Sequence, residues 1–78
     1  MDNEINKRIL PYIGKKVLCK DNENSYSRTR YIELEILQVS PSLDYTKIKY
    51  PSSCEIWIKT EDLFSKEWYR SYEILEIV

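Results

Sequence analysis

Two short segments of alternating apolar and polar residues flank Pro51-Ser52-Ser53, and this pattern limits the fold more than any other feature of the chain. A period of two is typical of β-strands, and the three residues between the segments suit a tight connection. With that turn, one side of the hairpin pairs Tyr50 with Cys54, Ile48 with Ile56 and Thr46 with Ile58. The other side pairs Lys49 with Glu55, Lys47 with Trp57 and Tyr45 with Lys59. The pattern therefore predicts an antiparallel hairpin with an apolar inner face and an outer face that holds an opposite-charge pair and a cation–π pair.

Two further strands are expected before this hairpin. Gly14 permits a tight entry into a first strand over residues 15–20, and the polar stretch 21–28 is interpreted as an exposed binding loop in which Tyr26 is the only apolar group. A second strand covers residues 31–39, but its apolar positions change phase at Ile36 and Leu37. Because a strand keeps a strict period of two, this change predicts a bulge or bend at that point.

Short helical segments are expected at two places. Ile5, Ile9 and Ile13 are four residues apart, so residues 2–10 are predicted to form a short helix that ends before Pro11 and covers one end of the sheet. Residues 60–68 start with Thr60 as a capping residue and place Leu63, Phe64 and Trp68 on one face, which predicts one or two helical turns. A final strand follows over residues 72–78.

Length and composition restrict the class of protein. A chain of 78 residues has room for one core, so residues 1–78 are expected to form a single domain. Ala is absent and Gly occurs once, whereas Tyr occurs seven times, which favours strands over long helices. The formal net charge is −1, so no overall field attracts nucleic acid or a membrane. The acidic start of the chain lacks the features of a signal peptide, and we expect a cytoplasmic location without membrane contact.

The passage Glu55-Ile56-Trp57-Ile58-Lys59-Thr60-Glu61-Asp62-Leu63, in its setting of polar loop, bent strand, hairpin, helical turn and last strand, resembles the SH3-like small-barrel superfold. The resemblance covers residues 14–78 as a pattern of elements and carries no ligand-contacting residues over. It implies a mostly β fold: a closed five-stranded SH3-like barrel, capped by a short N-terminal helix over residues 1–13, with a short helical turn before the last strand.

The residue types required for most catalysis are missing. The chain has no His to activate a nucleophile and only Gly14 for a phosphate loop, so we expect no catalytic residues, no cofactor and no enzymatic activity. The carboxylate pairs Glu33/Glu35 and Glu61/Asp62 are better explained by a solvated strand face and a helix start. Cys19 and Cys54, without His or a Cys-x-x-Cys motif, cannot form a four-ligand zinc site, and two buried reduced thiols are favoured over a disulfide.

The outer hairpin face is the best candidate for binding a partner. Aromatic residues frequently anchor interfaces, although Trp57 could instead be covered by the N-terminal helix or by Trp68. The candidate contacts are Tyr45, Lys47, Lys49, Trp57 and Lys59, with Tyr26 and Tyr69 as additions, whereas Trp68 and Tyr72 are expected in the core. A protein partner is favoured over nucleic acid because nucleic-acid-binding domains are usually strongly basic.

Two alternatives remain open. Lys47, Lys49 and Lys59 around the two aromatic rings are also typical of a strip that stacks single-stranded bases, which Lys15, Lys16, Lys20, Arg28 and Arg30 could extend. The second alternative is that the chain is a structural subunit of a larger assembly. We expect a non-catalytic adaptor or inhibitor, of the kind encoded by a phage or mobile element, for example an anti-CRISPR-type inhibitor of a host defence system.

Overall fold

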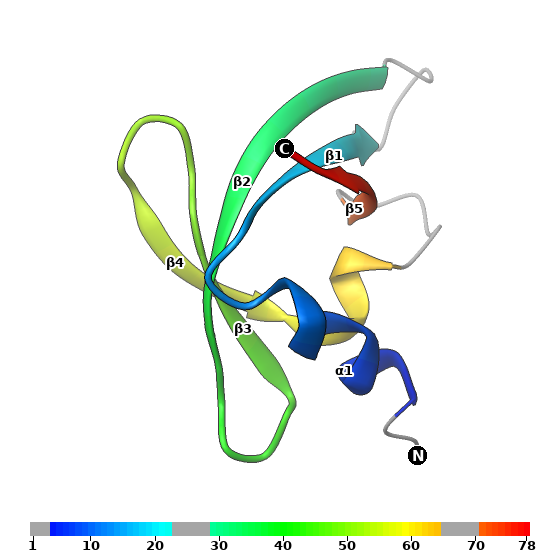
Figure 1. Cartoon of the computed structure of the whole chain (residues 1–78), viewed down its shortest axis with the longest axis vertical. Coiled ribbons are helices and arrows are strands. Elements are labelled where there is room, and N and C mark those ends of the chain that lie inside the picture. Colours follow the sequence, from blue (N-terminus) through cyan, green and yellow to red (C-terminus); the bar gives the residue numbers. More distant parts are fainter. Residues whose placement is uncertain (1–3, 23–28, 65–70) are drawn as a thin grey trace.

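The computed structural model describes residues 4–22, 29–64 and 71–78. Its elements, in chain order, are helix α1 (Glu4–Ile9), the 3-10 turn η1 (Leu10–Tyr12), strands β1 (Lys16–Asn22), β2 (Thr29–Val39), β3 (Tyr45–Lys49) and β4 (Glu55–Lys59), the 3-10 turn η2 (Thr60–Leu63) and strand β5 (Ser71–Ile77). All five strands join one antiparallel sheet with the order β4-β3-β2-β1-β5 (Figure 1). The expected mostly β class, with a short helix at the start and a helical turn before the last strand, is confirmed.

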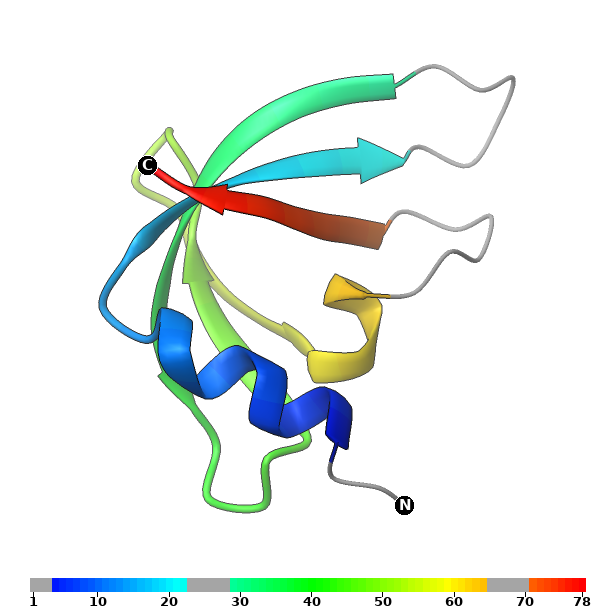
Figure 2. The same ribbon diagram turned by 45° about the vertical axis from the view of Figure 1, so that its right-hand side comes forward.

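The expectation of a closed barrel is wrong for the described part of the chain. The sheet curls but stays open, because β4 and β5 form its two edges and no ladder between described residues joins them. The chain leaves the sheet at Thr60, directly after β4, and forms the 3-10 turn η2 instead of continuing as a strand. Helix α1 and η2 both lie on that concave side (Figure 2). They therefore occupy the space that would become smaller if β4 and β5 paired to close a barrel.

The core fills the concave side of the sheet. Ile9 from α1 and Leu63 from η2 are fully buried together with inward-facing strand residues, namely Val17, Cys19, Leu34, Ile36, Ile48 and Tyr72. Arg8 lies over the Phe64 ring, with its guanidinium carbon 5.5 Å from the ring centroid, and so attaches the helix to the end of η2. The hydroxyl groups of Tyr50 and Tyr72 are hydrogen-bonded, which links the end of β3 to β5 across the interior.

The predicted hairpin register is confirmed. Ile48 lies opposite Ile56 and Thr46 opposite Ile58, while Lys47 lies opposite Trp57 on the other face. The turn is closed by the amide of Tyr50, which donates to the carbonyl oxygen of Cys54 at 2.9 Å. Ser53 takes a positive φ of 67° inside this turn, which lets the chain reverse within three residues.

The predicted phase change in β2 is also confirmed. Ile36 pairs with Ile48 and Gln38 pairs with Lys47, so Leu37 is the extra residue of a bulge. A second bulge, which the sequence pattern does not show, falls between β1 and β5. There Leu18 pairs with Glu76 and Cys19 with Ile74, which leaves Leu75 as the extra residue. Bulges bend a strand and increase its twist, so these two positions help the sheet curl around its core.

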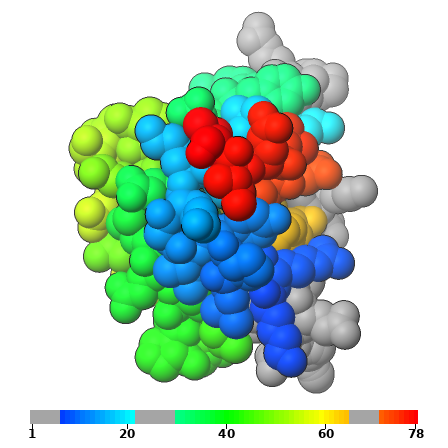
Figure 3. Space-filling model, in the orientation of Figure 1, coloured from blue at the N-terminus to red at the C-terminus, as the bar shows by residue number. Residues whose placement is uncertain are grey.

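The C-terminal end of the chain lies beside the entry into β1. Figure 3 shows the C-terminal residues against the segment that follows η1. The amide of Val78 donates to the carbonyl oxygen of Lys16 at 2.8 Å, and Gly14, with a φ of 81°, donates its amide to the carbonyl oxygen of Ile36 at 2.7 Å. Gly14 therefore provides the tight entry into β1 that the sequence predicts.

Several local expectations are wrong. Asp21 lies within β1 rather than in an exposed loop, and it is fully buried with an ion pair of 3.0 Å to Arg30. Ile13 does not continue the helical stripe but is exposed, because the α-helix ends at Ile9 and residue 13 has an extended backbone. Thr60 forms no side-chain cap, because its hydroxyl group is hydrogen-bonded to that of Thr46 at 3.0 Å in the interior. One or two helical turns were expected over residues 60–68, and the 3-10 turn η2 confirms the first of them, whereas residues 65–68 lie outside the described residues.

The two cysteines differ in burial, which corrects the expectation of two buried thiols. Both are unpaired, but Cys19 is buried in the core while Cys54 is exposed in the hairpin turn. Burial is the main cause that raises the pKa of the Cys19 thiol from 9.0 to about 12, and the negative charge of Asp21 adds to the rise. The protonated thiol therefore contributes to stability in full below about pH 9, and this contribution is lost as the pH rises towards 12.

These environments predict different thiol reactivity. In the folded protein at pH 8, dithiobis(nitrobenzoate) is expected to modify Cys54 rapidly and Cys19 only after unfolding, because a thiolate must form and be reached. The absorbance change should therefore correspond to one thiol per chain without denaturant and to two with it. The Cys54→Ser variant should show no rapid phase. Rapid modification of two thiols in the folded wild type would contradict this placement of Cys19.

The hairpin register predicts a stability difference between two identical substitutions. Ile48→Val removes one methyl group from the core and should lower the free energy of unfolding by about 1 kcal/mol. Ile77→Val, at a side chain that is 50% exposed, is the matched control and should change it by less than about 0.5 kcal/mol. Urea unfolding followed by tryptophan fluorescence measures both values. Equal losses would show that residue 48 does not face the core.

Candidate interaction face

Strands β3 and β4 present six side chains away from the core, and we name this surface the hairpin face. Its members are Tyr45, Lys47, Lys49, Glu55, Trp57 and Lys59. They point outward because the strands alternate, with Thr46 and Ile48 directed into the core. Trp57 is 47% exposed and Tyr45 is 45% exposed, so neither ring is covered by α1. Tyr45 lies opposite Lys59 and Trp57 opposite Lys47, which makes the two rings diagonal neighbours across the hairpin.

Two lysines of the hairpin face form ion pairs with glutamates of the same chain. The Nζ atom of Lys47 lies 3.2 Å from a carboxylate oxygen of Glu55, its diagonal neighbour. The expected cross-strand pair, Lys49 with Glu55, is in register, but the observed ion pair is the diagonal one. Lys59 lies 4.0 Å from Glu61. Exposed pairs of this kind contribute little to stability, but each places a carboxylate beside a lysine.

A row of alternating charge crosses the outer side of the sheet. Lys16 on β1 lies opposite Glu35 on β2, Glu35 opposite Lys49 on β3, and Lys49 opposite Glu55 on β4. Directly opposite residues on one face are close neighbours, so each charge in this row has an oppositely charged neighbour. The row ends at Glu55, because β4 is an edge of the sheet.

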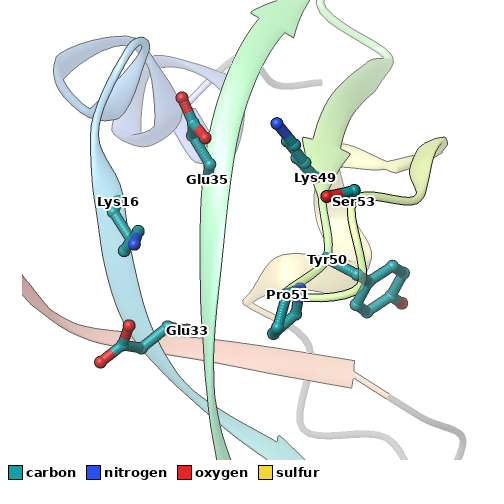
Figure 4. Close-up of a pocket in the computed structure, with 7 residues that line it drawn as sticks. All are labelled: Lys16, Glu33, Glu35, Lys49, Tyr50, Pro51 and Ser53. Atoms are coloured by element: carbon teal, nitrogen blue, oxygen red, sulfur yellow. The ribbon is translucent and has the colours of Figure 1, made fainter.

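A shallow groove lies beside the hairpin face (Figure 4). Its volume is about 240 Å³, and it is open to solvent. The sheet contributes two lysines and two glutamates to its walls, namely Lys16, Glu33, Glu35 and Lys49. The β3–β4 turn contributes Tyr50, Pro51 and Ser53. With equal numbers of both charges, the groove has no preference for an anion or a cation.

The basic residues that could extend a nucleic-acid strip mostly lie beside carboxylates where the structure describes them. Lys20 lies opposite Glu73, and Arg30 forms an ion pair of 3.0 Å with Asp21. Lys16 belongs to the row of alternating charge, and Lys15 is exposed. Arg28 lies outside the described residues.

The two carboxylate pairs singled out from the sequence lie in different surroundings. Glu33 and Glu35 lie opposite Leu18 and Lys16 on the outer side of the sheet, as the solvated-face interpretation expects. Partial burial is the main cause that raises the pKa of Asp62 above 3.8, with Lys59 acting in the opposite direction and Glu61 adding to the rise. Within the ranges 4–22, 29–64 and 71–78, no three groups of the types that ligate metals come together.

The remaining residues singled out from the sequence fall into two groups. Tyr26 and Tyr69, and also Trp68, lie outside the described residues. Tyr72 is buried in the core as expected. The sequence analysis missed the part of Glu35 in the row of alternating charge, because that part depends on pairing between β1, β2 and β3. Of the pairings in this row, only that of Lys49 with Glu55 could be predicted from the sequence.

Comparisons with protein families, with curated proteins and with solved structures find no match to this chain. In the described part of the chain, no helix has the length and apolar character needed to cross a membrane.

Proposed function

We propose that this chain is a non-catalytic binding module that engages a protein partner through the hairpin face, as an adaptor or an inhibitor. One observation carries the proposal: Trp57 and Tyr45 are both about half exposed on neighbouring positions of one hairpin. Large aromatic side chains bury much apolar area with little loss of conformational entropy, and Trp and Tyr are enriched among the residues that dominate binding energy. Their exposure on a paired set of strands supports a docking role.

The charge distribution supports a protein partner over nucleic acid. Binding to a phosphate backbone requires several lysines or arginines without nearby carboxylates. On the hairpin face, Lys47 and Lys59 each lie within 4.0 Å of a glutamate, and Lys49 lies between Glu35 and Glu55. A surface with both signs around an aromatic centre is suited to a protein surface of complementary charge pattern.

The strand order supports an SH3-like assignment for the fold. Five antiparallel strands in the order β4-β3-β2-β1-β5, with a 3-10 turn between β4 and β5, agree with the arrangement expected for that superfold. Because this architecture serves many unrelated functions, the assignment adds nothing about the partner. A small binding module of this kind would suit an accessory protein of a phage or mobile element, including an inhibitor of a host defence system.

Alanine substitutions on the hairpin face provide the test. The Tyr45→Ala/Trp57→Ala variant and the wild type are immobilised, and the proteins recovered from a bacterial lysate are compared by mass spectrometry. We expect the variant to lose the recovered partner, since truncation of such anchors typically costs about 2 kcal/mol or more in binding. Both side chains face solvent, so the variant should keep its fold.

Tyr31→Ala is the matched control. Tyr31 is 64% exposed on the same side of the sheet, but on β2 and opposite Lys20, away from the hairpin. This variant should recover the same partner as the wild type. Equal recovery by all three proteins would contradict the proposed face. Recovery of nucleic acid by the wild type at low salt, lost in the double variant, would favour the single-strand alternative.

A further inference from the structure

Strand β4 is an edge of the sheet, and three of its residues direct their backbone amide and carbonyl groups away from β3. The amide of Tyr50 donates to Cys54, and the amide of Thr60 donates to Asp44 at 3.0 Å. Hydrogen-bonded pairs alternate along an antiparallel ladder, so Ile56 and Ile58 direct their amide and carbonyl groups towards β3. Glu55, Trp57 and Lys59 therefore direct theirs away from the sheet.

This edge lacks three of the devices that protect edge strands against a further strand. Natural edge strands are commonly protected by a bulge, a proline or an inward-pointing charge. The β3–β4 ladder runs without a shift over five residue pairs, β4 contains no proline, and its two charged side chains lie on the outer face. The opposite edge, β5, carries the bulge at Leu75. A strand could therefore be added to β4 without distortion.

The sequence of β4 is complementary to itself in the antiparallel direction. Glu55-Ile56-Trp57-Ile58-Lys59 has its acid and its base at equal distances from Trp57. If two copies pair around Trp57, Glu55 lies opposite Lys59 of the second copy on both sides of the axis, and the isoleucines lie opposite one another. We propose that two copies of this chain pair through β4 in this register and form one continuous sheet.

The backbone geometry allows this register, and the side-chain charges distinguish it from its neighbours. In the pairing centred on Trp57, residue 57 forms a hydrogen-bonded pair with residue 57 of the second copy, and residue 55 forms one with residue 59. These are the residues whose backbone groups point away from the sheet. Centring the pairing on Ile56 would place Glu55 opposite Trp57, and centring it on Ile58 would place Glu55 opposite Glu61. Only the first of these three registers matches both charges.

The pairing would also continue the row of alternating charge. Lys16, Glu35, Lys49 and Glu55 already alternate across four strands, and Lys59 of the second copy would follow as the next cation. An edge of five residues buries much less surface than a permanent dimer, so the association should be reversible and concentration-dependent. The inference goes beyond the proposed function, because the hairpin face could bind a partner with or without it.

Charge-exchange variants test the dimer directly. Sedimentation equilibrium of the wild type should give a mass that rises with concentration from 9.4 kDa towards twice that value. Glu55→Lys and Lys59→Glu each place like charges opposite one another at two symmetric positions, and each should weaken association about tenfold. The Glu55→Lys/Lys59→Glu double variant restores opposite charges and should associate like the wild type.

Mixing the two single variants provides the control for folding. Each alone should need about ten times the concentration of the wild type to associate to the same extent. An equimolar mixture should form a heterodimer, because one chain then carries lysine at positions 55 and 59 and the other carries glutamate at both. A misfolded variant could not be recovered in this way. The proposal is overturned if the wild type stays monomeric, if its mass exceeds that of a dimer, or if mixing restores no association. None of these results decides the proposed function, because the alanine variants of the hairpin face test partner recovery separately.

Discussion

The turn that closes the β3–β4 hairpin fixes a single register, and both faces of the protein depend on it. The hydrogen bond from Tyr50 to Cys54 places Thr46 and Ile48 in the core and Lys47 and Trp57 on the surface. Side chains alternate strictly along a strand, so a shift by one residue would exchange the two sets. A domain of this size has few other apolar residues to compensate for such an exchange.

The rest of the fold completes the burial that the hairpin begins. Bulges at Leu37 and Leu75 help the sheet curl, and Ile9 and Leu63 fill its concave side from outside the sheet. Because helical elements occupy that space, the two edge strands stay apart. The open edge of β4 and the exposure of Trp57 thus follow from the way in which the core is filled. The proposed binding face and the proposed dimer both use this part of the molecule.

Local patterns in the sequence predicted those parts of the structure that depend on neighbouring residues. The hairpin register and the bulge at Leu37 follow from the period of two within short segments. Features that depend on contacts between distant segments were not predicted. Asp21 looked like a loop residue because its ion pair with Arg30 forms across two strands, and Thr60 looked like a cap because its partner Thr46 is 14 residues away. Of the candidate site, the sequence predicted the hairpin face but not the row of alternating charge, which requires the pairing of four strands.

Hydrogen exchange of the individual β4 amides is the most direct test of the hairpin register. The measurement uses NMR spectroscopy on the Lys59→Glu variant, so that pairing between copies does not protect the edge. The register predicts slow exchange for the amides of Ile56 and Ile58, which point towards β3, and fast exchange for those of Trp57 and residue 59, which point to solvent. The reverse pattern, or equal exchange along the strand, would contradict the register and with it the assignment of Trp57 to the surface.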